Sequence, residues 1–115
     1  MRQFTQVMKA LSDPSRVAVL KILEQGELCA CEIQYLLELA QPTVSKHLKI
    51  LEESGLVKRR RQGTWMLYSL SAGEESVYAR TMLEQLKDWL GNDPTVQKMT
   101  QALPEAASLR SDKNK

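Results

Sequence analysis

Two cysteines separated by one residue, Cys29 and Cys31, have the most distinctive chemistry in this chain. In the middle of a helix, residues two apart point about 200° away from each other and could not hold one ion together. Cys29, however, stands three residues before Glu32, where a capping box places a Ser or Thr. A capping residue has an extended backbone, so its side chain can turn toward that of Cys31. The pattern therefore predicts a pair of thiols at the start of a helix.

A thiol pair at a helix start has a predictable chemistry. The positive end of the helix dipole favours thiolates, so we expect the pKa of both thiols to be lowered. Two such thiolates suit a soft, thiophilic ion. The spacing also permits a structural interpretation, in which Cys29 packs beside Ile33 and Leu36 while Cys31 has no role. Structural zinc fits poorly because it needs four ligands, and a disulfide across a single residue would be strained.

A second set of chemically useful residues lies on the segment from Gln41 to Gly55. Three apolar residues recur at the spacing of one helix face, namely Val44, Leu48 and Leu51. Pro42 suits the first turn of this helix, and Gly55 suits the position after its last turn. The opposite face carries Thr43, Ser45, Lys46 and Lys49. Hydroxyls and cations on one face can bind phosphates and read base edges in a major groove, although an isolated helix of this kind is more often a solvated surface.

A basic hairpin follows this helix directly. Residues 56–61 read as a strand, residues 62–64 with Gly63 at their centre as a tight turn, and residues 65–70 as the returning strand. Residues 46–61 hold six cations against two glutamates, although the net charge of the whole chain is only +2. A charged hairpin alone would more often be a solubilising surface. Directly after a DNA-recognition helix, such a hairpin is the wing of a winged-helix domain, which contacts the DNA backbone or the minor groove.

Three helical segments precede the recognition helix at residues 41–55 and must position it. The first has an apolar face made of Phe4, Val7, Met8 and Leu11. The second begins at Asp13 and Pro14 and ends near Gly26, and Asp13 should pair with Arg16 across its first turn. The third has an inward stripe made of Ile33, Leu36, Leu37 and Ala40. Because a short turn joins the third helix to the recognition helix, the two form a helix-turn-helix.

The C-terminal part of the chain is predicted to serve assembly. A helix resumes at Ser76 and should end near Gly91, and its apolar residues include Val77, Met82, Leu86, Trp89 and Leu90. We expect this helix and the first one to pair with their copies in a homodimer, with simple packing onto the core as the alternative. Residues 95–103 could form one more short helix, and residues 104–115 are expected to be disordered. The predicted domains are thus a DNA-binding and dimerisation domain over residues 1–91 and a C-terminal extension over residues 92–115.

The composition of the 115 residues is that of one ordinary soluble domain. No apolar run approaches the length of a membrane span, and the first residues carry no apolar export segment. We therefore expect a cytoplasmic protein with reduced thiols and no membrane partner. No acid–base pair or phosphate loop suggests an enzyme. The predicted fold is mainly α with a small β-hairpin, a winged helix-turn-helix that dimerises through its terminal helices.

Taken together, these motifs resemble the ArsR family of metal-responsive winged-helix repressors. The resemblance runs from about Phe4 to about Leu90 and is carried by residues 11–16, by residues 41–57 and by the hairpin residues 62–70. It implies a homodimer bound to an inverted-repeat operator in double-stranded DNA. The DNA contacts would come from Gln41, Thr43, Ser45, Lys46, His47 and Lys49 on the recognition helix and from Arg59, Arg60, Arg61 and Gln62 on the wing. For His47, which borders the buried stripe, packing between helices is the alternative.

Residues 27–33 resemble the arsenic-sensing branch of this family, whose Cys-x-Cys binds As(III) or Sb(III). That branch often supplies a third thiolate three residues later, where this chain has Gln34. The resemblance therefore implies a two-thiolate effector site at Cys29 and Cys31, completed by hydroxide or an exogenous thiol, and no required cofactor. The zinc and cobalt sensors use His on the last helix, and this chain has none there.

The function implied is that of a repressor that leaves its operator when As(III) or Sb(III) bridges Cys29 and Cys31. Two rivals remain open from the sequence. The cysteines could act as a redox switch or bind another soft metal in the same DNA-binding repressor. A winged helix could also serve as a protein-interaction module that does not bind DNA.

Overall fold

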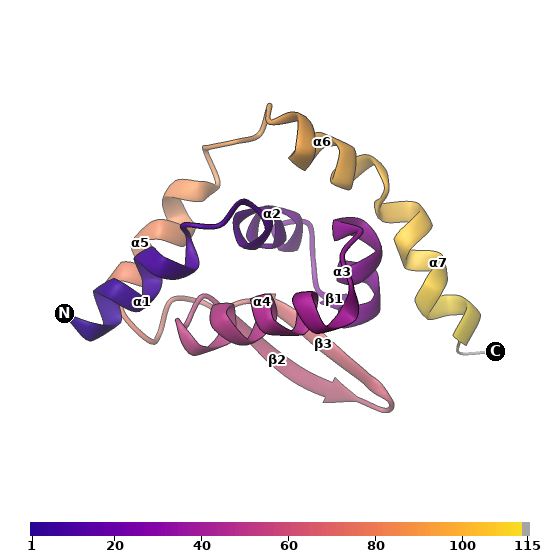
Figure 1. The fold of residues 1–115 in the computed structure, drawn as a ribbon, viewed down its shortest axis with the longest axis horizontal. Coiled ribbons are helices and arrows are strands. Elements are labelled where there is room, and N and C mark those ends of the chain that lie inside the picture. The colour runs from indigo at the N-terminus through magenta and orange to yellow at the C-terminus, as the bar shows by residue number, and fades with distance from the viewer. Residues whose placement is uncertain (114–115) are drawn as a thin grey trace.

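A computed structural model describes the backbone of residues 1–113 and the side chains of residues 1–110. In chain order the elements are α1 (Arg2–Ala10), α2 (Pro14–Leu23), β1 (Leu28–Cys29), α3 (Ala30–Leu37), α4 (Gln41–Glu53), β2 (Val57–Gln62), β3 (Trp65–Leu70), α5 (Val77–Leu86), α6 (Pro94–Gln101) and α7 (Leu103–Lys113). Figure 1 shows α2 in the middle of the molecule, α4 and the long hairpin below it, and α6 and α7 arching over its other side. The predicted helix-turn-helix with a hairpin wing is confirmed. No helix among the described residues is long and apolar enough to cross a bilayer.

A three-stranded antiparallel sheet in the order β1-β3-β2 joins the wing to the helices. Gln62 pairs with Trp65, so the hairpin turn is two residues long, and Gly63 at its start has a φ of +63°. This positive φ is the conformation that glycine adopts at no steric cost. The sequence did not predict β1, because it is only two residues long and exists through its pairing with residues 67 and 68 of β3.

The core lies where α2, α3 and α4 meet the base of the sheet. α2 starts at an N-cap in which the Asp13 carboxylate accepts a hydrogen bond from the backbone N–H of Arg16, at 3.1 Å. From Ala18 to Leu23 every residue of α2 is buried. The largest fully buried side chains include Leu20, Ile22, Ile33, Leu51 and Leu56. Full burial of each such side chain stabilises the fold by roughly 2 kcal/mol, and Leu51 contributes this burial from the apolar face of α4.

Gly55 ends α4 and directs the chain into the wing. Its φ is +80°, and a β-carbon at this position would lie 2.6 Å from the β-carbon of Glu75. Both the backbone conformation and the lack of space require glycine here. The predicted helix end at Gly55 is therefore confirmed.

α5 ends earlier than the sequence predicts. The Leu86 carbonyl accepts hydrogen bonds from the buried ammonium of Lys21 and from the N–H of Trp89. In a continuing α-helix this carbonyl would instead pair with the N–H of residue 90. Leu90 adopts a left-handed conformation, with φ of +65°, and the Trp89 and Leu90 side chains are 48% and 44% exposed. The prediction that this helix ends near Gly91 is thus wrong, and Trp89 and Leu90 lie beyond its end.

The segment that was expected to be a disordered tail is instead helical. The short helix predicted over residues 95–103 is present as α6, and α7 follows it up to Lys113. α7 packs along α3, where Ala106 is fully buried and the Tyr35 hydroxyl donates a 2.8 Å hydrogen bond to Glu105. Because its support comes from a helix about 70 residues earlier in the chain, local composition did not reveal it. Residues 114 and 115, the end of the predicted tail, lie outside the described part.

Candidate nucleic-acid interface and thiol site

The outer face of α4 carries the polar residues expected to contact DNA. Val44, Leu48 and Leu51 are buried, which turns the other side of the helix outward. The side chains that are exposed there are Gln41, Thr43, Ser45, Lys46 and Lys49. The exposed face therefore carries an amide, two hydroxyls and two ammonium groups, which is the donor set that reads phosphates and base edges.

The turn between α3 and α4 lacks glycine, and a non-glycine residue adopts the left-handed conformation that ends α3. Glu38, the residue after the last turn of α3, takes the left-handed conformation with φ of +57° and ψ of +39°. Its N–H donates to the carbonyl of Gln34 at 3.0 Å, which closes the helix. Leu39 and Ala40 then lead directly into α4, so the two helices of the motif are tightly joined.

The wing is basic, but two of its arginines are already paired within the chain. Arg59 lies 3.0 Å from Glu52 of α4, and Arg60 makes a two-point contact with Glu27 at 2.9 and 2.7 Å. The hydrogen bond to Arg60 lowers the pKa of Glu27 and raises that of Arg60. Since successive side chains of a strand point to opposite faces, Arg61 shares the α4 side with Arg59.

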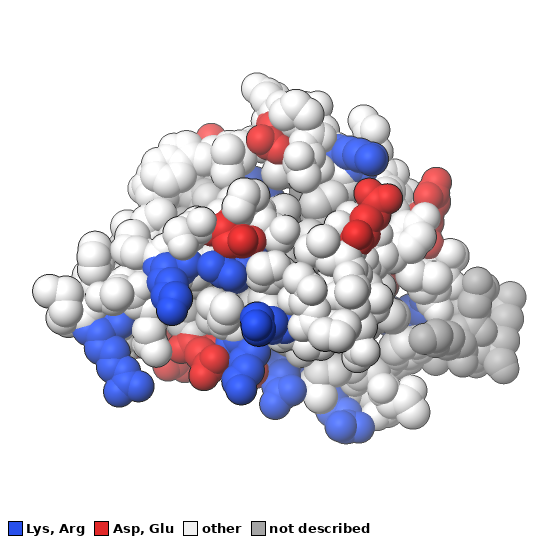
Figure 2. Space-filling view, in the orientation of Figure 1, with Lys and Arg blue, Asp and Glu red and all other residues white. Residues whose placement is uncertain are grey.

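Lys46, Lys49 and Arg61 lie on the α4 side of the wing, whereas Lys58 shares the opposite side of the hairpin with Arg60. Among the described residues, Lys46, Lys49, Lys58 and Arg61 are exposed and form no ion pair. In Figure 2, which keeps the orientation of Figure 1, Lys and Arg gather along the lower face, over α4 and the hairpin. This surface is the one that a duplex would meet if α4 entered a major groove.

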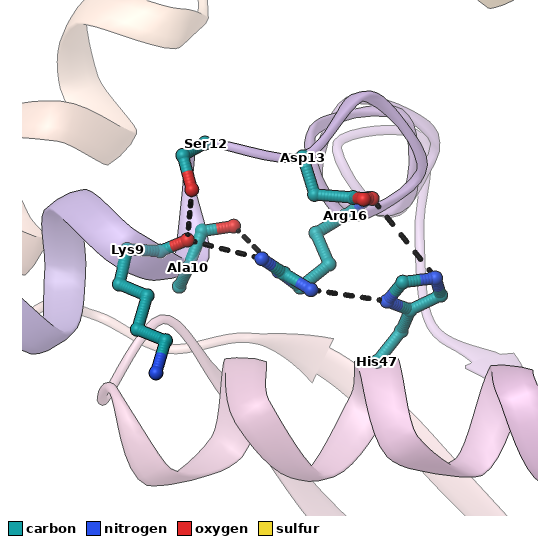
Figure 3. A network of polar contacts seen from close by, with 6 residues as sticks. All are labelled: Lys9, Ala10, Ser12, Asp13, Arg16 and His47. Carbon is teal, nitrogen blue, oxygen red and sulfur yellow. Dashed lines mark hydrogen bonds and ion pairs between the residues drawn. The ribbon is translucent and has the colours of Figure 1, made fainter.

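His47 is directed differently from its neighbours on α4. Its imidazole turns toward the start of α2, where Nδ1 lies 3.2 Å from the Arg16 guanidinium and Nε2 lies 3.9 Å from the Asp13 carboxylate (Figure 3). The side chain is only 13% exposed. Arg16 was expected to pair with Asp13, but only its backbone N–H does so, because its guanidinium reaches α1 and His47 instead.

The two thiols stand at the start of α3, as the capping pattern predicts. Cys29 is the N-cap residue with φ of −80° and ψ of 161°, and its N–H donates to the Glu32 carboxylate at 2.8 Å. Both cysteines are free; Cys29 is buried and Cys31 is half-buried. Both thiols thus lie at the same end of α3, and the extended cap conformation frees Cys29 from the separation of about 200° that a continuous helix would impose.

The electrostatics of Cys29 differ from the prediction. Burial first, and the hydrogen bond with Cys31 second, raise the pKa of the Cys29 thiol from 9.0 to about 12. The expected lowering by the helix dipole is therefore wrong for Cys29. The physical reason is that a side chain only 1% exposed loses the hydration of its thiolate, and the Glu32 carboxylate beside it opposes a second negative charge.

An ion held by the thiol pair would have two protein ligands. In the part of the chain whose side chains are described, no three or more His, Cys, Asp and Glu side chains are grouped to hold a metal ion. Glu32 is committed to the Cys29 N–H and lies 3.7 Å from Arg110 of α7. Sequence reasoning missed Glu27, Arg110 and the role of Arg16, since each acts on residues at least six positions away and leaves no local pattern.

Comparison with known proteins places these features in a family. The model of the family described as "Bacterial regulatory protein, arsR family" matches residues 13–59, a span that holds both the thiol pair and α4. An arsenic resistance transcriptional regulator of Pseudomonas putida is 40% identical over 92 residues, which are 76% of this chain and 71% of that protein. An arsenical resistance operon repressor of Staphylococcus xylosus is 40% identical over 70 residues, 61% of this chain and 67% of that protein.

A solved structure gives the same picture at the level of the fold. The homodimeric winged helix-turn-helix DNA-binding domain of a Mycobacterium bovis protein superposes with a TM-score of 0.62 at 34% identity. The match covers 76% of this chain and 80% of that domain. The similarity therefore extends well beyond the helix-turn-helix itself.

Proposed function

The chain belongs to the ArsR family of bacterial regulatory proteins, and we propose that it is a DNA-binding transcriptional repressor that As(III) or Sb(III) releases from its operator. The proposal rests on one observation. Helix α3, whose N-cap is Cys29, packs directly against the recognition helix α4. Relatives named as arsenical resistance operon repressors support the same effector class. A site of action in the cytoplasm, where the DNA is, belongs to this proposal.

We further propose that two copies bind an inverted repeat. The end of the molecule formed by α1 and α5 exposes Phe4, Val77 and Tyr78, and the rings of Phe4 and Tyr78 stack edge to face at 5.3 Å. An exposed aromatic patch of this kind favours a two-fold interface. The homodimeric relative from Mycobacterium bovis supports it. Two copies of α4 would then enter successive major grooves about 34 Å apart.

The exposed residues of α4 and the wing would make the DNA contacts. Gln41, Thr43, Ser45 and Lys46 suit base edges and phosphates, and Lys49 suits a phosphate. Arg61 and Gln62 extend to the tip of the wing, while Arg59 and Arg60 would have to exchange a carboxylate for a phosphate. We assign His47 to the support of α4 because its ring faces α2.

The effector chemistry is consistent with protonated thiols. Arsenous acid has three hydroxyl groups, and each As–S bond would form as a thiol proton leaves with one hydroxide as water. Two such exchanges at Cys29 and Cys31 leave arsenic with one hydroxyl, which an exogenous thiol could replace. The high pKa of Cys29 therefore does not hinder the reaction, since the departing hydroxide takes up the proton.

The burial of Cys29 also bears on the redox rival. Oxidation by peroxide proceeds through a thiolate, and reactive cysteines have a lowered pKa and an exposed sulfur. Cys29 has the opposite properties, since it is buried and its pKa is raised to about 12. Cys29 is therefore unlike a reactive redox thiol, and the relatives named for arsenic or arsenical resistance favour ligation of As(III) or Sb(III) over oxidation as the signal.

Release would follow from the position of the thiols. Drawing both sulfurs onto one ion changes the cap of α3, and α3 packs against α4. The effector weakens DNA binding only to the extent that it binds the DNA-incompetent state more tightly.

The test uses a duplex that the wild-type protein selects from a random pool. Addition of arsenite should release this duplex from the wild-type protein but not from Cys29→Ser plus Cys31→Ser, while peroxide should release neither. The serine variant is expected to keep its affinity without effector, because neither sulfur lies on the outer face of α4. Arsenite release that persists in the double serine variant would refute the proposed site, and wild-type protein that selects no duplex would favour the protein-interaction module.

A further inference from the structure

Three elements of the fold meet at the guanidinium of Arg16 (Figure 3). Its Nε donates to the Ala10 carbonyl at 2.8 Å, and one terminal nitrogen donates to the Lys9 carbonyl at 3.0 Å. The other terminal nitrogen lies 3.2 Å from Nδ1 of His47 on α4. One side chain of α2 thus connects the C-terminal end of α1 with the middle of the recognition helix.

The contacts with α1 use carbonyls at its C-terminal end, and that of Lys9 also accepts hydrogen bonds from the N–H and the hydroxyl of Ser12. Lys9 and Ala10 are the last two residues of α1, and the last four carbonyls of a helix lack intrahelical partners. These carbonyls form the negative end of the helix dipole, which a cation stabilises. A planar guanidinium can donate to both carbonyls and still direct a third donor elsewhere, which an ammonium cannot do in fixed geometry.

The contact with α4 depends on an acceptor nitrogen. Because Nδ1 faces a guanidinium, which only donates, the imidazole must accept there and carry its proton on Nε2. Nε2 faces the carboxylate of Asp13, which is itself fixed as the N-cap of α2. The ring is therefore confined between two charged groups of α2 and leaves the exposed face of α4 to its neighbours.

We propose that Arg16 is a positioning residue that fixes the angle between α1 and the recognition helix, and so sets the half-site spacing that the dimer reads. The inference rests on the proposed function, in which α1 lies at the two-fold interface and α4 lies in the groove. If α1 sets the position of the dimer axis and Arg16 links α4 to α1, the separation of the two recognition helices in the dimer is fixed. Loss of the Arg16 contacts would allow α4 to adjust to other half-site spacings.

The experiment measures spacing preference rather than affinity alone. The probes are the duplex that the wild-type protein selects from a random pool and duplexes with one base pair inserted or deleted between its half-sites. The wild-type protein should lose at least about tenfold in affinity for each altered spacing. Arg16→Met should narrow this difference to about threefold or less. Lys9→Met, which removes a cation from the same place but keeps the carbonyl, should behave as wild type.

Variants of His47 keep the test decisive if Arg16→Met fails to fold. His47→Asn retains an acceptor near the position of Nδ1 and should keep the spacing preference, whereas His47→Leu should lose it. If both single variants fold, combining Arg16→Met with His47→Leu should cause no further loss of spacing preference, since each substitution already removes the contact between Arg16 and His47.

The outcomes separate this inference from the proposed function. A wild-type protein that selects no duplex contradicts both. A wild-type protein with a sharp spacing preference that is unchanged in folded Arg16→Met, or in His47→Leu, overturns the inference and leaves the proposed function intact.

Discussion

At the scale of single residues, position in the fold decides what the two cysteines can do. Cys29 has the extended backbone of an N-cap, and Cys31 follows it in the first turn of α3. The same position buries the thiol and places a carboxylate beside it. The sequence alone could identify the cap, because the capping box is a local pattern. It could not give the pKa, because burial depends on residues far away along the chain.

The raised pKa of Cys29 makes a specific prediction. Its thiolate should form with an apparent pKa of about 12, well above the 9.0 of an unperturbed thiol, because the folded protein favours the neutral form. Thiolate absorbance near 240 nm, followed against pH as the difference between wild type and Cys29→Ala, measures this value. The stability due to the neutral thiol should be complete below about pH 9 and decline as the pH rises toward 12. A midpoint below 9 in the difference titration would contradict the description of the site.

At the scale of the elements, local signals predicted what local interactions determine. The apolar stripe Val44, Leu48 and Leu51, with Gly55 after it, was sufficient for α4. The wing was equally readable, because its strands pair within one hairpin. β1 and α7 were not, since each depends on a partner that is distant in sequence. The end of α5 was misplaced for the same reason, because Lys21 of α2 occupies its last carbonyl.

A matched pair of substitutions tests whether α7 is docked. Ala106 is fully buried against α3, and its neighbour Ala107 is exposed. Ala106→Asp should lower the free energy of unfolding by at least about 1 kcal/mol, because a carboxylate would be buried without a partner or α7 would detach. Ala107→Asp should change it by less than about 0.5 kcal/mol. Urea unfolding of the two variants decides the matter, and equal effects would mean that α7 does not pack as described.

At the scale of the whole molecule, a small net charge of +2 is distributed so that one face is basic. Binding through this face should be strongly salt-dependent, since each phosphate contact releases counterions. Lys46→Ala and Arg61→Ala should each reduce the slope of log affinity against log salt by about 1. Arg60→Ala should reduce it by less, because Glu27 already neutralises this arginine. Salt titrations of the three variants on one duplex measure the slopes, and a wild-type slope near zero would exclude this face as the DNA surface.

The measurement that tests the central claim most directly is the affinity for arsenite with and without DNA. Coupling between two sites is reciprocal, so an effector that releases DNA must bind more weakly to the DNA complex than to the free protein. We predict that the selected duplex weakens arsenite binding by the same factor by which arsenite weakens DNA binding, and that Cys29→Ser plus Cys31→Ser abolishes both effects. Arsenite binding of equal strength with and without the duplex would contradict the account, because the thiol pair would then have no influence on how α4 meets DNA.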